Sequence, residues 1–435
     1  MEKYWNAAAE KMSRDEIHEL QSKKLKRTLE RVYTNVPYYR AKMQQKGILP
    51  GDIKTIDDLE YLPFTTKQDL RETYPFGLFA VPMSEVVRIH ASSGTTGKQT
   101  VVGYTAHDIE IWAECVARAL TIAGADNTSM VQVSYGYGLF TGGMGAHYGS
   151  ERIGASTVPT SSGNTKRQIT LLKDFGATHL CCTPSYAIYL GETIRDMGLD
   201  ISEFKLKGGL FGAEPWTEGM RAELERLLRL DAHDIYGLSE IMGPGVAVDC
   251  SQKSGLHVWE DHFVPEIIDP DTEKVLPAKS NGELVFSCLS KEAFPLIRYR
   301  TRDVSSLNYD ECECGRTHVR MSKPCGRTDD MLIIRGVNVF PSQIEQVLME
   351  LGETSPHYML IVDRDGQLDT LEVQVEISDS HFFDEVRKME SLAAKIRAAL
   401  QSMLGIAAKV TLVEPKSIER SEGKAKRIID KRNLY

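Results

Sequence analysis

Apolar residues recur at helical spacing through the first 50 residues of the chain. Among many lysines, arginines and glutamates, the apolar positions are Ile17, Leu20, Leu25, Leu29 and Val32. This spacing predicts an amphipathic helix, which should end near Asn35-Val36-Pro37 because the residue before a proline avoids helical backbone. A further helix is expected to start within residues 65–70, where two threonines precede an acid.

From about residue 86 to 250, short apolar runs alternate with amphipathic segments. The apolar runs are 129–133, 178–182 and 209–211, and helical segments are predicted at 109–122 and 166–175. This alternation predicts βαβ units, and therefore an α/β fold with a mainly parallel sheet covered by helices. Ligands of such sheets bind beyond the carboxyl ends of the strands. The glycine-bearing turns 135–145, 212–215 and 236–240 should lie there.

The pattern changes after about residue 257. Short β-rich pieces with turns continue to about 325 and predict a small antiparallel subdomain, with strands at 263–268, 283–286 and 296–299. Beyond residue 330 we expect a strand at 331–334, a helix after 339, a hairpin around Arg364-Asp365-Gly366, a helix at 392–404 and a last strand at 409–413. The chain thus divides into a large N-terminal domain, 1–328, and a small α+β domain, 329–435.

Composition narrows the classes of protein to consider. The chain has 435 residues, 42% hydrophobic and 26% charged, with a net charge of −9. This balance disfavours a general nucleic-acid-binding surface. No apolar run reaches the ~20 residues of a membrane span, and no signal-peptide pattern opens the chain, so no membrane association and a cytoplasmic location are expected. The eight cysteines are then expected as free thiols, metal ligands or catalytic groups.

The stretch 92–98 combines three hydroxyls, two glycines and a lysine in seven residues. It follows an apolar run at 86–89 and precedes a segment that can start a helix. Backbone N–H groups, hydroxyls and an ammonium suit a polyphosphate ligand. The glycine spacing differs from a Walker loop. From these residues alone, a phosphate loop and a flexible surface turn both remain open.

Four residues on either side of the β-rich segment suggest a metal site. Cys250 and His257 lie before it, and Cys312 and Cys314 lie near its end. Three thiolates and an imidazole could close a tetrahedral structural Zn²⁺ site. Cys325 is a rival fourth ligand, His262 and His318 are rival nitrogens, and a set of ordinary free thiols is the alternative. The adjacent pair Cys181-Cys182 is expected in the core.

Five motifs occur together in a recognisable order. They are 92–98, Tyr236-Gly237-Leu238-Ser239-Glu240, Tyr299-Arg300-Thr301-Arg302-Asp303, Gly326-Arg327-Thr328-Asp329-Asp330 and Glu422-Gly423-Lys424. Their order and spacing resemble those of the adenylate-forming enzymes, the superfamily of acyl-CoA synthetases, luciferases and peptide-synthetase adenylation domains. Within it the chain is most similar to the phenylacetate–CoA ligases, through the stretches 135–143, 212–216, 259–263 and 335–341.

The resemblance implies an AMP-forming ligase that uses ATP, Mg²⁺ and coenzyme A. A carboxylate would attack the α-phosphorus of ATP and release pyrophosphate, and the CoA thiolate would then displace AMP. The small domain would rotate between these steps about a hinge at Asp329. Lys424 would be the catalytic lysine, with Lys426 as the competing assignment, and Glu240 the catalytic Mg²⁺ ligand.

The resemblance also implies binding residues. For ATP and AMP they are Ser93, Thr95, Thr96, Lys98, Gly212, Ala213, Glu214, Pro215, Asp234, Tyr236, Gly237, Ser239, Asp303 and Arg327. For the acyl pocket they are Tyr135, Phe140, Gly142 and Trp216, and for coenzyme A Arg335 and Gly336.

The resemblance implies an arylacetate substrate, phenylacetate first, and among the alternatives the aromatic pocket disfavours only a short-chain acid. Alternatives are indoleacetate, benzoate or a short-chain acid, acyl transfer to a carrier protein, or a non-catalytic nucleotide-binding or zinc-scaffold protein. A homodimer is possible.

Overall fold

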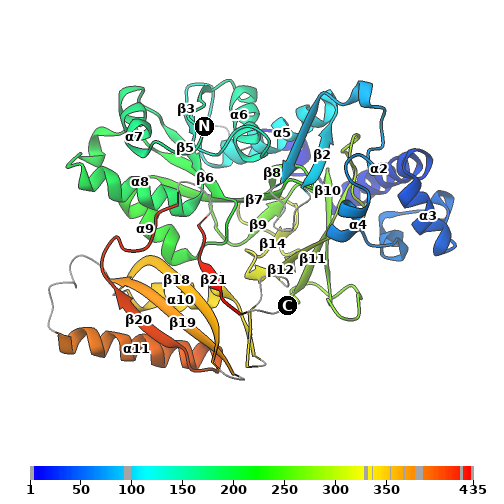
Figure 1. Cartoon of the computed structure of the whole chain (residues 1–435). Coiled ribbons are helices and arrows are strands. Elements are labelled where there is room, and N and C mark those ends of the chain that lie inside the picture. The colour runs from blue at the N-terminus through cyan, green and yellow to red at the C-terminus, as the bar shows by residue number, and fades with distance from the viewer. Residues whose placement is uncertain are drawn as a thin grey trace. The chain divides into compact units, whose positions relative to one another are not determined.

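The structure, a computed structural model, describes residues 4–92, 99–327, 332–335, 337–352, 354–365, 368–377, 386–421 and 425–432. The chain forms two compact units (Figure 1). Unit 1 comprises Met1–Cys182, Asp200–Ala213 and Leu230–Lys323. Unit 2 comprises Thr183–Leu199, Glu214–Arg229 and Pro324–Tyr435. Two helices from the middle of the sequence therefore group with the C-terminal part of the chain.

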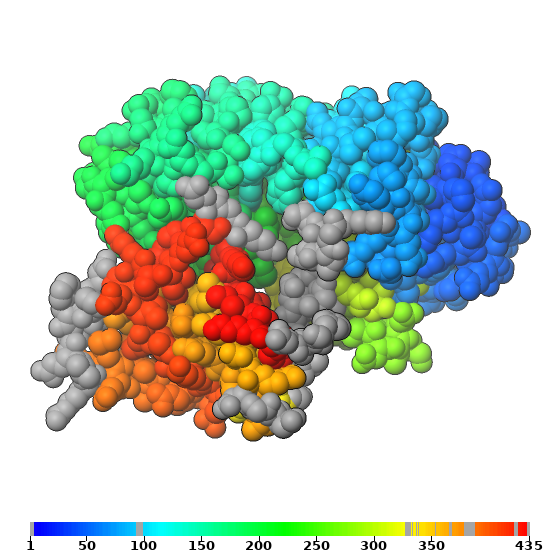
Figure 2. Space-filling model, in the orientation of Figure 1, coloured from blue at the N-terminus to red at the C-terminus, as the bar shows by residue number. Residues whose placement is uncertain are grey.

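The N-terminal helices confirm the predicted amphipathic pattern. Helix α2 begins after Ser13, whose hydroxyl and the carboxylate of Glu16 cap each other's backbone N–H groups. It ends at Asn35, since extended Val36 precedes a proline that starts α3. Lys42 of α3 pairs with Asp69 of α4 at 3.0 Å, so the N-terminal helices and the segment after them form one continuous surface (Figure 2). The helices are α1 (Ala7–Glu10), α2 (Arg14–Asn35), α3 (Pro37–Gln45) and α4 (Lys67–Glu72), with short 3₁₀ turns at Pro50–Asp52, Ile56–Tyr61 and Met83–Glu85.

A nine-stranded sheet forms the centre of unit 1, with the strand order β13-β14-β9-β8-β7-β6-β5-β3-β4. It is parallel from β4 to β7 and antiparallel beyond. Helices α5 and α6 pack on its surface (Figure 1), as the βαβ pattern predicts. The strands are β3 (Met130–Val133), β4 (Ser156–Val158), β5 (His179–Cys182), β6 (Gly208–Gly212), β7 (Asp231–Leu238), β8 (Gly243–Asp249), β9 (Leu256–Val258), β13 (Leu307–Asn308) and β14 (Arg320–Met321). The unit's later helices are α5 (Ala106–Ile122), α6 (Gly142–Arg152) and α7 (Thr165–Asp174), with a 3₁₀ turn at Ile201–Glu203.

The β-rich segment is divided between two sheets. Strands β9, β13 and β14 extend the large sheet, while β10 (Phe263–Ile268), β11 (Gly282–Cys288) and β12 (Tyr299–Ser305) form a separate antiparallel sheet. The strand predicted at 296–299 is shifted, because β12 begins only at Tyr299.

The segment after residue 98 is a strand, so the predicted helix start there is wrong. β1 (Arg88–Ser92) pairs antiparallel with β2 (Thr100–Tyr104). The consecutive β-branched residues Thr100, Val101 and Val102 explain the difference, because such residues favour a strand.

Unit 2 has its own apolar core. Its sheet has the order β20-β19-β18-β21, and α10 and α11 pack on it. The prediction that 409–413 is the last strand is wrong, since Ile428–Asp430 pairs with β18. The elements are α8 (Pro184–Asp196), α9 (Glu218–Leu228), α10 (Pro341–Leu351), α11 (Val386–Leu404), β15 (Gly326–Arg327), β16 (Leu332–Ile334), β17 (Val337–Val339), β18 (Thr354–Asp365), β19 (Leu368–Ile377), β20 (Lys409–Val413) and β21 (Ile428–Asp430).

Candidate active site

The carboxyl ends of β6 and β7 lie side by side in the large sheet. The two strands are parallel, with Gly212 opposite Ile235, so Ala213 and Tyr236 follow at the same edge. Ala213 adopts a φ of 70°, a left-handed conformation that turns the chain sharply away from the strand. The predicted nucleotide-binding residues of unit 1 therefore begin where ligands of parallel sheets bind.

A hydrogen bond joins this edge to the second sheet. The Tyr236 hydroxyl donates to the Asp303 carboxylate at 2.5 Å, and the Tyr236 ring stacks on Phe286 of β11. Asp303 lies in a bulge of β12, because the pairing with β11 jumps from Val304 to Arg300. A bulge re-aims side chains next to functional sites. The structure thus brings together two residues that are 67 positions apart in the sequence.

The turn between β7 and β8 carries Ser239 and Glu240. The Ser239 and Thr141 hydroxyls lie 2.9 Å apart, which links the turn to the start of α6. The Glu240 side chain is 8% exposed, and within the described part of the chain it makes no hydrogen bond or ion pair. A largely buried carboxylate with free oxygens fits Mg²⁺, which prefers one or two carboxylates and completes its shell with phosphate and water oxygens.

Two other predicted residues of β7 have clear structural contacts. The backbone N–H of Asp234 donates to Asp249 at 3.0 Å, and the Asp234 carboxylate lies 3.7 Å from the Lys323 ammonium. A Cβ on Gly237 would come within 2.0 Å of the Gly243 carbonyl, so the tight β7–β8 approach requires glycine there.

The predicted acyl-pocket residues of unit 1 follow β3. Tyr135 is buried and its hydroxyl donates to the Leu210 carbonyl at 3.5 Å; burial raises the pKa of this phenol well above 10. A Cβ on Gly142 would lie 3.1 Å from the Phe140 ring. Phe140 itself is 44% exposed, so in this structure its ring is available to contact a ligand.

Further predicted residues lie in unit 2. The Glu214 carboxylate accepts backbone N–H groups from Ser185, at the start of α8, and from Ala425, each at 2.8 Å. It therefore holds the segment that leads to exposed Lys426. Trp216 is buried under Arg221, whose guanidinium lies 4.8 Å from the ring centroid. Pro215 directly follows Glu214 in the sequence. Arg335 is exposed and donates to the Asp369 carbonyl at 2.8 Å.

Several predicted residues lie outside the described part of the chain. They are Ser93, Thr95, Thr96, Lys98, Asp329, Gly336 and Lys424, together with the side chain of Arg327. Their assignments remain predictions.

The Cys/His set forms a compact buried cluster, as the sequence predicts. We call it the Cys/His cluster: Cys250, His257, Cys312 and Cys314, with the ligand atoms all within 4.8 Å of one another. The Sγ atoms of Cys250 and Cys312 are 3.7 Å apart, and Cys314 Sγ is 3.4 Å from His257 Nε2. A zinc ion about 2.3 Å from sulfur and about 2.0 Å from nitrogen would separate tetrahedral ligands by about 3.5–3.8 Å. The cluster geometry therefore fits Zn²⁺, whereas a disulfide needs sulfur atoms only about 2.05 Å apart.

The surroundings of the Cys/His cluster favour metal binding. A tight turn brings Cys312 and Cys314 together, with Gly315 at a φ of 83° donating to the Cys312 carbonyl. His257 Nδ1 lies 3.1 Å from the His318 carbonyl, a contact that fixes the tautomer with Nε2 free for a metal. Hydrogen bonds from Cys250 and then His257 lower the pKa of the Cys314 thiol. A thiolate is the form that binds zinc.

The rival ligands have other contacts. Both ring nitrogens of His318 face backbone groups, the Val258 and Ala9 carbonyls, and His262 Nδ1 faces the Ser290 hydroxyl. Cys325 is exposed, unlike the four buried residues of the cluster. Cys181 and Cys182 are buried in β5, as expected.

Some residues near the site were missed from the sequence. Thr141 and Lys323 contact predicted residues, and Lys291 is buried beside the Glu240 turn. A lysine between a serine and a glutamate has no pattern that predicts burial, so no sequence signal would have found Lys291.

Comparisons with known proteins agree with these features. The family model of the AMP-binding enzymes matches residues 13–288, and that of the AMP-binding enzyme C-terminal domain matches 336–432. The chain is 51% identical over 426 residues to the phenylacetate-coenzyme A ligase of Aromatoleum evansii, covering 97% of this chain and 96% of the relative. It is 51% identical over 427 residues to that of Escherichia coli K12, covering 98% and 97%. The crystal structure of 2-hydroxyisobutyryl-CoA ligase in the postadenylation state has a TM-score of 0.93 at 30% identity, covering 99% and 93%. Among the described helices, none is long and apolar enough to cross a bilayer.

Proposed function

This chain belongs to the AMP-binding enzyme family and, within it, to the phenylacetate–coenzyme A ligases; we propose from this premise how its residues adenylate phenylacetate and pass the acyl group to coenzyme A. Enzymes of this kind use ATP, Mg²⁺ and coenzyme A. The observation that best supports the proposal is the hydrogen bond between Tyr236, near the carboxyl end of β7, and Asp303, with the buried Glu240 in the turn that follows β7.

In the first half-reaction, the substrate carboxylate attacks the α-phosphorus of ATP, and the bond to pyrophosphate breaks. Asp303 would accept both ribose hydroxyls, since a carboxylate offers two acceptor oxygens, and the Tyr236 hydroxyl holds it in place. Glu240 would hold Mg²⁺, which when bound supplies positive charge to the phosphate oxygens. The loop 92–98, with Ser93, Thr95, Thr96 and Lys98, would bind the leaving phosphates.

The catalytic cation of this step is Lys424 in our proposal. An ammonium between the attacking carboxylate and the α-phosphate stabilises charge that develops in the transition state. Glu214 supports the idea indirectly, because its bond to the Ala425 N–H anchors the residue next to Lys424. Lys426 is the alternative.

In the second half-reaction, the CoA thiolate attacks the acyl carbon, and AMP leaves with the electron pair of the broken bond. The two half-reactions require different groups near the same atoms. We propose that Asp329 is the hinge for this exchange and that Arg335 and Gly336 then contact coenzyme A.

For the acid, we propose that an aromatic pocket of unit 1 includes Tyr135 and Phe140, and that Gly142 leaves room for the ring of the substrate; a role of Trp216 in binding the acid stays a prediction from the resemblance. Aromatic pairs add ~0.5–1.5 kcal/mol beyond area burial. The exposed ring of Phe140 supports a role in ligand contact.

An ATP–pyrophosphate exchange screen across carboxylic acids tests the substrate. We expect phenylacetate to give the highest kcat/KM, above indoleacetate, benzoate and short-chain acids. A higher value for any of these would refute the assignment. Consumption of free coenzyme A separates a CoA ligase from an enzyme that loads a carrier protein.

We further propose that the Cys/His cluster binds a structural Zn²⁺ ion. The ligand separations of 3.4–3.7 Å and the complete set of four protein ligands support this role, because a closed tetrahedral site leaves no position for substrate. Elemental analysis of the purified protein tests it. About one equivalent of zinc is expected, and a content below about a third of an equivalent would refute it.

A further inference from the structure

Lys291 is a cation in the core of unit 1. It is 2% exposed, and its ammonium donates to the Ile241 carbonyl at 3.1 Å. The ammonium also lies 4.2 Å from the ring centroid of Tyr104 and 5.4 Å from that of Phe294. Within the described part of the chain it forms no salt bridge, although the charges of Asp108 and Glu240 attract it. Burial lowers its pKa to about 8, and a buried charge is costly, so a plain packing role explains it poorly.

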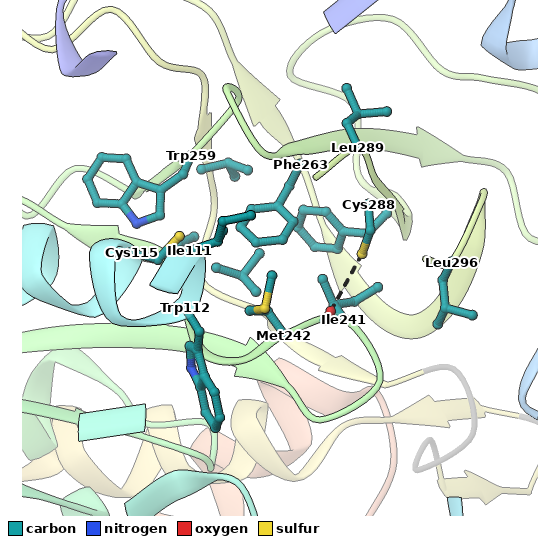
Figure 3. Packing of buried hydrophobic residues seen from close by; sticks show 14 of the residues in the cluster. Ile111, Trp112, Cys115, Ile241, Met242, Trp259, Phe263, Cys288, Leu289 and Leu296 are labelled. Carbon is teal, nitrogen blue, oxygen red and sulfur yellow. Dashed lines mark hydrogen bonds between the residues drawn. The ribbon is translucent and has the colours of Figure 1, made fainter. Parts of the chain in front are cut away.

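The carbonyl that Lys291 binds belongs to the turn that carries Glu240. Two backbone carbonyls of this turn and one at the start of β8 are each held by a buried side chain. Lys291 binds that of Ile241, the Tyr104 hydroxyl donates to that of Met242 at 3.0 Å, and Trp112 Nε1 donates to that of Pro244 at 2.9 Å. The Cys288 thiol is a weaker second donor to the Ile241 carbonyl, at 3.6 Å (Figure 3).

Apolar packing completes this support. The side chains of Ile241 and Met242 are fully buried and point into the cluster that contains Trp112 and Phe263 (Figure 3). The backbone on the C-terminal side of Glu240 is therefore fixed, while its carboxylate makes no bond to a described residue. The direction of that carboxylate is set by the backbone of the turn.

Lys291 is itself held in place from a different element. The Asp108 carboxylate, in the first turn of α5, accepts the backbone N–H groups of Glu292 at 2.6 Å and Ala293 at 2.9 Å. The two residues after Lys291 are thus bound to α5, and the Tyr104 ring beneath the ammonium lies just before that helix. Because Lys291 is attached to α5 in this way, it can hold the backbone of the Glu240 turn in a fixed position.

We propose that Lys291 is a positioning residue for Glu240: by holding the Ile241 carbonyl, it keeps the Glu240 carboxylate in the geometry that binds Mg²⁺ with ATP. The inference rests on the proposed role of Glu240 as the Mg²⁺ ligand. It assigns an effect on metal binding to a buried lysine that acts through the backbone of the turn.

The direction in which Mg²⁺ binding changes when Lys291 is replaced distinguishes a positioning role from an electrostatic role and from a purely structural role. A purely electrostatic role predicts that removing the ammonium strengthens Mg²⁺ binding, because a nearby like charge is lost. A purely structural role predicts lower stability with unchanged Mg²⁺ dependence. A positioning role predicts weaker Mg²⁺ binding although a cation has been removed.

The test compares ATP affinity with Mg²⁺ and with EDTA, by isothermal titration calorimetry in the absence of acid substrate. In Lys291→Met we expect the Mg²⁺-dependent gain in ATP affinity to fall about 10-fold or more, as for other residues that orient a metal ligand, with the affinity in EDTA unchanged. The control is Lys46→Met, which removes another lysine that donates to a backbone carbonyl, that of Tyr61 at 3.4 Å. It should keep the full gain.

An unchanged or larger gain in Lys291→Met would overturn the inference. If that variant does not fold, Tyr104→Phe keeps the ring and removes only the hydroxyl that binds the Met242 carbonyl. A smaller loss in the same direction supports the inference, and an unchanged gain overturns it. Glu240→Gln separates the two proposals, since a full gain in that variant refutes Glu240 as the ligand, whereas a loss there with none in Lys291→Met refutes only the role of Lys291.

Discussion

Strand β8 has a different kind of site at each end. It starts at Gly243, directly after the Glu240 turn, and ends at Asp249, directly before Cys250. Seven residues span only about 20 Å. At the first end a buried carboxylate makes no bond to a residue that the structure describes, while at the other end four ligand atoms lie within 4.8 Å of one another.

In our proposal, this difference separates a site that reacts from one that stabilises. A ligand that keeps free oxygens can accept a metal together with a substrate, and it can release both again. Four ligands that close a tetrahedron leave no position for substrate, so their binding energy contributes to folding. The same sheet therefore supports both, and the two can be perturbed independently.

The largest expected effect is on stability at the Cys/His end. Cys314→Ser should remove bound zinc and lower the free energy of unfolding by on the order of 5 kcal/mol, since zinc binding in small domains is worth more than this. Chemical denaturation and elemental analysis would measure it. The matched control is Cys181→Ser, which changes another buried cysteine and should keep zinc. Retained zinc and stability in Cys314→Ser would contradict the distinction.

The next effect is on activity at the Glu240 end. Glu240→Gln keeps the shape of the side chain but removes its charge, so we expect acid-dependent pyrophosphate release to fall about 100-fold. Zinc content and thermal stability should stay unchanged. Glu110→Gln, an exposed change on α5, serves as the control. A full rate in Glu240→Gln would show that the free carboxylate has no role in adenylation.

The pH dependence of stability tests the contact between strands β7 and β8, which lies between the Glu240 turn and the Cys/His cluster. His233 of β7 lies 3.0 Å from both Asp231 and Asp249. Burial alone lowers its pKa, but the two hydrogen bonds and charges outweigh burial and raise it to about 9. A raised pKa contributes stability that is complete below about pH 6.5 and is lost as the pH rises through 9.

The comparison of wild type with His233→Gln measures this contribution. We expect a difference in unfolding free energy of up to about 3 kcal/mol at pH 6, shrinking towards pH 9.5. Burial lowers the pKa of His179 to about 4, so the difference for His179→Gln should stay constant over this range. A constant difference for His233→Gln as well would refute the ion-paired state.

Local patterns predicted most of the individual elements. The spacing of Ile17, Leu25 and Val32 predicted α2, and the run at 178–182 predicted β5, because periodicity reports which face is buried. Strand β21 was missed because it has only three residues and forms by pairing with β18, Leu360 opposite Ile428. Such pairing is not encoded within the segment itself.

The two sites differ in how far sequence could predict them. The Cys/His cluster was predicted in full, because thiols and an imidazole have few roles other than metal binding when they are grouped. Glu240 and Asp303 were predicted through motifs, and their roles stay predictions. The β12 bulge that aims Asp303, and the burial of Lys291, depend on contacts between distant segments, and a lysine in sequence normally indicates solvent exposure.

The smallest expected effect tests the contact between the two sheets. Tyr236→Phe removes the hydroxyl that binds Asp303 but keeps the ring that stacks on Phe286. A hydrogen bond to a charged group contributes about 1.5–3 kcal/mol. We expect part of this energy to be lost from ATP binding, because Asp303 is no longer oriented, so that the KM for ATP rises up to about 10-fold, and the rest to be lost from stability. Initial rates over a range of ATP concentrations measure it, and Tyr61→Phe, an exposed tyrosine, is the control. If KM stays constant while stability falls, the hydrogen bond stabilises the fold alone. The contact between Tyr236 and Asp303 would then be a stabilising one, and it would not belong to the part of the molecule that reacts, which contains Glu240.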